Sequence, residues 1–187
     1  MALFILGLMI FVGGHLFLAT ARGTRQGLVD RLGEMPFKGL VSLIFLLGLV
    51  ITVIGWRMTS PAPLLYTPPE WLRPVNYLLV WAAFVLSTAA YVPAGRIAVA
   101  VKHPMVLGVK LWAFAHLLTN GELRSVLLFS VMLAWGVIDR IALKKRGDVG
   151  RPYQSATGDI VSVIGGSIGF AAVFLWLHPY IAGVAVS

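Results

Sequence analysis

The chain has 187 residues, of which 59% are hydrophobic and 12% are charged. Soluble globular domains carry roughly 25% charged residues, so this composition excludes a soluble fold and predicts an all-α, polytopic bundle of membrane helices. The net charge of +8 does not indicate nucleic-acid binding, because the basic residues lie in short connections between apolar runs. With no cysteine the chain has no disulfide, thiolate metal site or Cys-x-x-Cys-His haem attachment.

About six apolar runs are long enough to cross the bilayer, and we predict one membrane domain over residues 1–187. The first run has no basic residues before it, which favours a retained span over a cleaved signal peptide. Residues 21–38 are predicted to be a polar loop, and the proline-rich residues 57–74 an interfacial loop or short lid. The predicted spans are residues 1–20, 39–56, 75–92, 96–118, 123–138 and 158–177.

The fourth span is interrupted by Pro104, which either starts a helix or kinks a longer one. Only 14 residues separate Met105 from Leu118 inclusive, so a re-entrant segment is the alternative. The positive-inside rule favours a full crossing, because a re-entrant segment would place the basic loop around Lys144 on the outer side. We therefore expect six spans, cytoplasmic basic loops and both termini outside the cytoplasm.

Two histidines lie inside predicted spans. His15 follows Gly13 and Gly14, whose missing side chains would admit a flat macrocycle or a neighbouring helix. His116 has Trp112 one turn before it, which supplies an aromatic wall. These surroundings suit haem b held by side chains of a helix bundle. The commoner role of a lone buried histidine is a hydrogen bond between helices.

The remaining features have simpler interpretations. His103 and His178 each precede a proline and are expected in non-helical backbone at span boundaries. Asp159 is expected to help start the sixth helix. Small residues in that helix (Ser162, Gly165, Gly166 and Gly169) predict a packing face, either within one chain or in a homo-oligomer. No nucleotide-binding or hydrolase motif is present, and no catalytic residue is assigned.

Together these residues resemble the NnrU family of bacterial membrane proteins. The similarity is carried by Gly14-His15-Leu16, Lys102-His103-Pro104-Met105, Gly108, Leu111-Trp112, Ala115-His116-Leu117, Asn120-Gly121 and Trp176-Leu177-His178-Pro179. The resemblance implies a bacterial inner-membrane protein linked to denitrification and nitric oxide metabolism, with partners among respiratory or denitrification proteins.

The family is related to the plant zeta-carotene isomerase, a membrane enzyme that uses haem b. By this resemblance His15 and His116 match the proposed axial ligands, and His103 matches another histidine of the isomerase's motif. With the neighbours Gly14 and Trp112, these residues form the predicted cofactor site. Ala113 departs from the isomerase, in which a cysteine is expected. The resemblance implies action on nitrogen oxides or on a polyene-like substrate, and leaves open whether the protein is an enzyme.

Two alternative functions belong to other classes of membrane protein. The His-Pro-x-x-x-Gly element from His103 to Gly108 is similar to that of the isoprenylcysteine carboxyl methyltransferases, although Lys102 replaces their arginine. A non-catalytic accessory protein of a respiratory reductase is the other alternative. Bound haem, bound S-adenosylmethionine or co-purification with a reductase would discriminate among the three.

Overall fold

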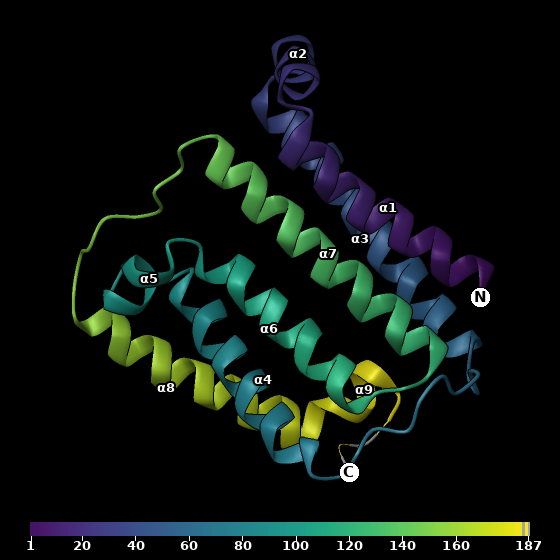
Figure 1. Ribbon diagram of the computed structural model, residues 1–187. Helices are drawn as coiled ribbons and strands as arrows, with labels where there is room; N and C mark the ends of the chain where they lie inside the picture. The colour runs from purple at the N-terminus through teal and green to yellow at the C-terminus, as the bar shows by residue number, and fades with distance from the viewer. Residues whose placement is uncertain (185, 187) are drawn as a thin grey trace. The chain divides into compact units, whose positions relative to one another are not determined.

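The structure is a computed structural model that describes residues 1–184 and 186 (Figure 1). All of its regular elements are helical, which confirms the predicted fold class. The chain forms two compact units. The first comprises Met1–Tyr66 and Glu122–Arg146, and the second comprises Thr67–Gly121 and the described residues from Gly147 onward. The prediction of one domain over residues 1–187 stays a prediction.

The first unit is built around α1 (Ala2–Thr20), which packs against α3 (Glu34–Met58) and α7 (Leu123–Lys145). Small residues on α3 let the backbone of α1 approach closely. A Cβ added at Gly48 would lie 2.8 Å from the Phe11 nitrogen, and one at Gly55 would overlap the backbone of Phe4. Close backbone approach through small residues is the usual way that helices associate in a bilayer, where apolar burial gives no net driving force.

The short helix α2 (Arg22–Leu32) also belongs to the first unit and corrects the predicted loop over residues 21–38. Its polar side chains gave no apolar periodicity, so it could not be recognised by that signal. The helix ends where Gly33 adopts a positive φ of 84°, a conformation that glycine reaches without steric cost. The α3 helix then begins five residues before the predicted start at residue 39.

A buried arginine near the start of α7 contacts the end of α3 in the first unit. The Arg124 side chain, near the start of α7, donates to the Glu122 carboxylate at 2.7 Å, and its guanidinium lies 4.6 Å from the centre of the Trp56 ring. The Leu123 amide donates to the Pro63 carbonyl at 2.8 Å. These contacts tie the loop after α3 to the start of α7, and the proline-rich residues 59–71 are non-helical as predicted.

In the second unit α4 (Leu72–Ala89) packs against α6 (Pro104–Thr119) on one side and α8 (Thr157–Ala172) on the other. The α8 interface uses the predicted small residues: Ser162 is buried, and a Cβ at Gly166 would lie 2.5 Å from the Val85 Cα. This confirms a packing face within one chain. The π-helical turn η1 (Val173–Leu177) and the short helix α9 (His178–Ala182) continue α8.

The predicted fourth span is not one continuous helix, and of the two roles expected for Pro104 the start of a helix is the one observed. The α5 helix (Arg96–Val101) ends at Lys102, whose φ of 65° no residue adopts inside a helix. His103 is non-helical, as predicted for a residue before proline, and Pro104 starts α6 at the first helical position. The break gives Pro104–Thr119 only 16 residues, whereas five other helices are long and apolar enough to span a membrane in the described part of the chain.

The loop after α7 and the first turn of α8 are hydrogen-bonded to the end of α4 and the start of α5. The Arg151 guanidinium donates to the carbonyls of Ala89 and Val92 at the end of α4. Asp159 does more than the sequence suggested: it lies in the first turn of α8, and its carboxylate accepts hydrogen bonds from the amides of Arg96 and Ile97 at 2.8 and 2.9 Å. It therefore caps α5, whose own N-cap residue is Gly95 and has no side chain to do so.

Candidate functional site: a histidine-lined pocket beside α4

The predicted site residues fall in both units. His15 and Gly14 lie on α1 in the first, while His103, Trp112 and His116 lie at the start of, or within, α6 in the second. The surroundings of each histidine differ.

His15 is packed among aromatic rings. Its ring stacks on Phe45 at 3.8 Å between centroids and 13° between planes, and it meets Trp135 edge-on at 5.7 Å. Gly14 makes room for Phe45, since a Cβ there would lie 2.6 Å from that ring. Of the two roles foreseen for this glycine, the close approach of a neighbouring helix is the one observed.

The Nδ1 atom of His15 lies 2.7 Å from the Phe11 carbonyl oxygen one turn earlier. A carbonyl can only accept, so Nδ1 carries the proton and Nε2 is the atom with a lone pair. Histidines that ligate metals commonly have this arrangement, because the second nitrogen's hydrogen bond fixes the tautomer and the ring.

His116 shows the same arrangement on α6. Its Nδ1 donates to the Trp112 carbonyl at 2.8 Å, and the rings of the two residues are tilted with centroids 5.2 Å apart. Ala113, at the position where the isomerase resemblance leads one to expect cysteine, is fully buried. Nε2 of His116 therefore carries the lone pair and is the ring nitrogen suited to bind a metal or accept a proton.

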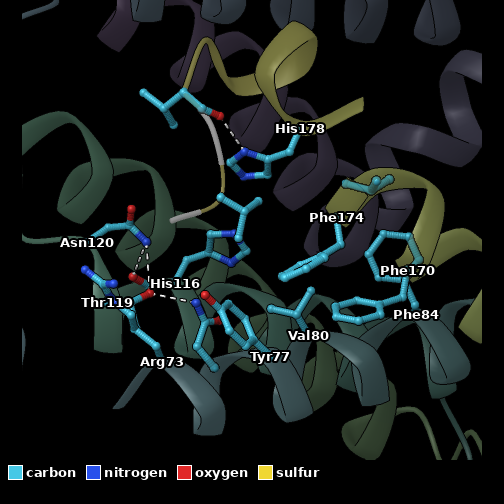
Figure 2. Close-up of a pocket in the computed structure, with 14 residues that line it drawn as sticks. Arg73, Tyr77, Val80, Phe84, His116, Thr119, Asn120, Phe170, Phe174 and His178 are labelled. Carbon is cyan, nitrogen blue, oxygen red and sulfur yellow. Dashed lines mark hydrogen bonds between the residues drawn. The ribbon is translucent and has the colours of Figure 1, made fainter. Parts of the chain in front are cut away.

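His116 lines a pocket of about 170 Å³ formed by α4, α6 and the end of the α8–α9 segment (Figure 2). One side of the pocket is apolar. Phe170 stacks on Phe174 at 5.4 Å and meets Phe84 edge-on at 6.2 Å, and Phe174 meets Tyr77 edge-on at 5.0 Å. The three phenylalanines lie together on one side of His116 in Figure 2. Val80, Val173, Val184 and Val186 complete the apolar lining.

The opposite side of the pocket is polar and carries Arg73, Thr119 and Asn120 (Figure 2). Asn76 also lines the pocket and is hydrogen-bonded to Thr119. Asn76 Nδ2 donates to Thr119 Oγ1 at 2.7 Å, and Asn120 Nδ2 donates to the His116 carbonyl at 2.9 Å. Asn76 Oδ1 is buried and accepts no hydrogen bond within the described part of the chain. An unsatisfied buried acceptor costs about 1–3 kcal/mol, so this corner is suited to receive a polar group.

His178 also lines this pocket, which the sequence did not predict. It was expected in non-helical backbone at the end of a span, yet its φ of −55° and ψ of −44° are helical, and it starts α9. Pro179 is tolerated because it falls in the first turn, where its missing amide hydrogen has no helical partner. The His178 Nδ1 donates to the Val184 carbonyl at 2.7 Å. The sequence singled out His178 only through the His-Pro pair that it shares with His103 and through the family motif Trp176-Leu177-His178-Pro179, neither of which places it in a pocket.

His103 lies outside the pocket. Its Nε2 is 3.2 Å from the Asp148 carbonyl oxygen and 3.7 Å from that residue's carboxylate. It holds the loop after α7 against the start of α6, so its position supports a structural role. Trp112, the other predicted neighbour, contacts His116 but does not line the pocket. No group of three or more His, Asp or Glu side chains suited to a metal ion occurs among the described residues.

Fold and site together define a multi-pass helical membrane protein with an amphipathic, histidine-lined pocket. A family model described as "NnrU protein" matches residues 3–186. The chain therefore belongs to the NnrU family, which confirms the resemblance drawn from its motifs. Neither the curated proteins nor the solved structures contain a match.

Proposed function

We propose that this NnrU-family protein binds haem b, with His116 as a residue that would hold its iron. One observation carries the proposal: the His116 Nδ1 is hydrogen-bonded to the Trp112 carbonyl, so Nε2 is the coordinating atom, and the same residue lines a pocket with three phenylalanines. Haem sites combine such an oriented imidazole with an apolar wall for the macrocycle.

The other lining residues fit the chemistry of the group. Arg73 supplies a cation for a propionate, while Phe84, Phe170 and Phe174 supply apolar surface for the ring. Drug-sized ligands occupy about 300–1,000 Å³, so a porphyrin needs more room than the present 170 Å³. Val184 and Val186 also line the pocket, and we expect the side chains of these two residues to move when the ring enters.

His15 remains a proposed ligand on the same chemical ground, since its Nδ1 hydrogen bond to Phe11 leaves Nε2 to coordinate. When bound, haem would supply an iron centre able to bind nitric oxide or to change oxidation state. The chain's own groups would orient the imidazole, neutralise the propionates and keep the ring among apolar side chains. We place the activity in nitric oxide metabolism or in isomerisation of a polyene-like substrate in the bilayer.

The test is haem content after expression with added haem precursor. Wild-type protein in a non-ionic detergent should show a Soret band and a pyridine haemochrome of the b type. His116→Ala should lose most of this haem, whereas His103→Ala, which removes a histidine outside the pocket, should retain it. Equal haem content in the two variants would contradict His116 as a ligand.

A further inference from the structure

We propose that the polar end of the pocket is a binding site for the carboxylate of an amphiphilic ligand. The site consists of Arg73 and Asn76 on α4, and the ligand's apolar body would lie along Val80 and the three phenylalanines. This site is on the side of the pocket away from those phenylalanines, and its existence does not depend on haem binding.

The charge of the pocket selects an anion. Arg73 is the only Lys or Arg among its described lining residues, and none of these residues is acidic. The guanidinium's ion pair with Glu70 has an N···O distance of 3.9 Å, which is beyond hydrogen-bond range, and the Arg73 side chain is 48% exposed. Arg73 therefore keeps its planar pair of N–H donors for a ligand, and this pair matches a carboxylate bidentately.

Asn76 supplies the second contact. Its Oδ1 is the buried acceptor without a partner, while its Nδ2 bonds the Thr119 hydroxyl. That hydroxyl can both donate and accept, so the amide can turn by half a rotation and keep the bond to Thr119 through Oδ1. Nδ2 then points to where Oδ1 stood and donates to the incoming carboxylate. In the present structure the Thr119 hydroxyl accepts a second N–H from Asn120 Nδ2 at 3.2 Å, and its own proton makes only a 3.5 Å contact to the Ala115 carbonyl. Little is therefore lost when that proton turns to Asn76 Oδ1.

The position of the site favours the same ligand. Arg73 and Asn76 lie in the first two turns of α4, where the helix dipole stabilises a negative charge. The apolar surface begins one turn later at Val80 and continues to Phe84. A ligand with a carboxylate at one end and an acyl chain or ring system behind it meets both surfaces. Such a group occurs in free fatty acids and in the propionates of haem.

The experiment compares acids with their esters on the full-length protein in dodecyl maltoside at pH 8. The first probe is cis-parinaric acid, detected by energy transfer from protein tryptophan, with its methyl ester as comparator. We expect the acid to bind at least about tenfold more tightly than the ester, as a charge-assisted hydrogen bond implies. The second probe pair is iron protoporphyrin IX and its dimethyl ester, which tests the propionates as the source.

Three variants make the result specific. Arg73→Gln removes the cation, and Asn76→Asp keeps the side-chain shape but removes the N–H donor and adds a negative charge. Both should abolish the preference for acid over ester. Arg96→Gln removes the same charge from an exposed position in the same unit and should leave the preference intact.

The outcomes separate the ligands and the two proposals. A preference with parinaric acid assigns the site to lipid acids, and a preference confined to the porphyrin pair assigns it to propionates; either supports a carboxylate site. Equal binding of acid and ester in both pairs, or identical behaviour of Arg73→Gln and Arg96→Gln, would overturn it. Parinaric acid binding without any haem binding would leave the carboxylate site standing and remove the haem proposal.

Discussion

Replacing Gly48 by alanine should loosen the contact between α3 and α1. The new Cβ would lie 2.8 Å from the Phe11 nitrogen and 3.1 Å from its Cα, whereas an ordinary contact is at least 3.4 Å. The α1 backbone must therefore move by about 0.6 Å, the difference between 2.8 and 3.4 Å. The Ile10 Cγ2 atom, at 3.0 Å, can be moved by side-chain rotation, but the two Phe11 atoms belong to the backbone, so side-chain rotation alone cannot relieve the clash. Overpacking of this kind costs about 1–3 kcal/mol.

Gly39→Ala is the matched control, because Gly39 is on the same helix and a Cβ there meets nothing within 4 Å. Both substitutions gain the same helix propensity, about 0.5–1 kcal/mol, so the gain cancels when the two variants are compared. The free energy of unfolding, measured by sodium dodecyl sulfate titration in mixed micelles, should be about 1–3 kcal/mol lower for Gly48→Ala than for Gly39→Ala. Equal unfolding midpoints would refute the backbone contact between α1 and α3.

Three further predictions concern single polar contacts. Arg124→Met removes the guanidinium from the Trp56 ring and leaves a Glu122 carboxylate that is 37% exposed without its cation, so the free energy of unfolding should fall by about 1–2 kcal/mol. Adding Glu122→Gln should restore part of the loss, and purely additive effects would argue against the pair. Asp159→Ala removes the acceptor for two amides of α5 and should cost about 1–2 kcal/mol, seen as faster hydrogen exchange at those amides; unchanged exchange would contradict the cap. Trp81→Phe loses the 2.9 Å bond to the Ser167 hydroxyl and should cost about 0.6 kcal/mol, with no change expected on the same scale from Trp71→Phe at an exposed position.

Much of the fold could be predicted because span length and apolar composition are local properties. The runs that became α1, α3, α4, α7 and α8 were all recognised, and most of their ends were predicted to within five residues, although α7 extends seven residues beyond the predicted end at residue 138. The α2 helix was missed because it is short and polar. Pro104 marked the place where a helix starts or is kinked. The break itself depends on the positive φ of Lys102, and a lysine gives no indication in the sequence that its φ is positive.

The candidate site was only partly predictable. His116 and its aromatic neighbour Trp112 lie one turn apart, so a helical reading brings them together. His178 was assigned to a span boundary because a residue before proline usually leaves the helix, and its place beside the same pocket depends on the π-helical turn of residues 173–177. Arg73 and Asn76 were hidden in a segment interpreted as a loop and the start of a span. Only the packing of α4 against α6 brings them to the pocket.

The most direct test of the account is the absorption spectrum of purified wild-type protein and His116→Ala, with helix content measured in parallel by circular dichroism. We predict a Soret band in the wild type that is largely lost in the variant while both retain the same helix content. A folded, haem-supplied wild-type protein without a Soret band would contradict haem binding.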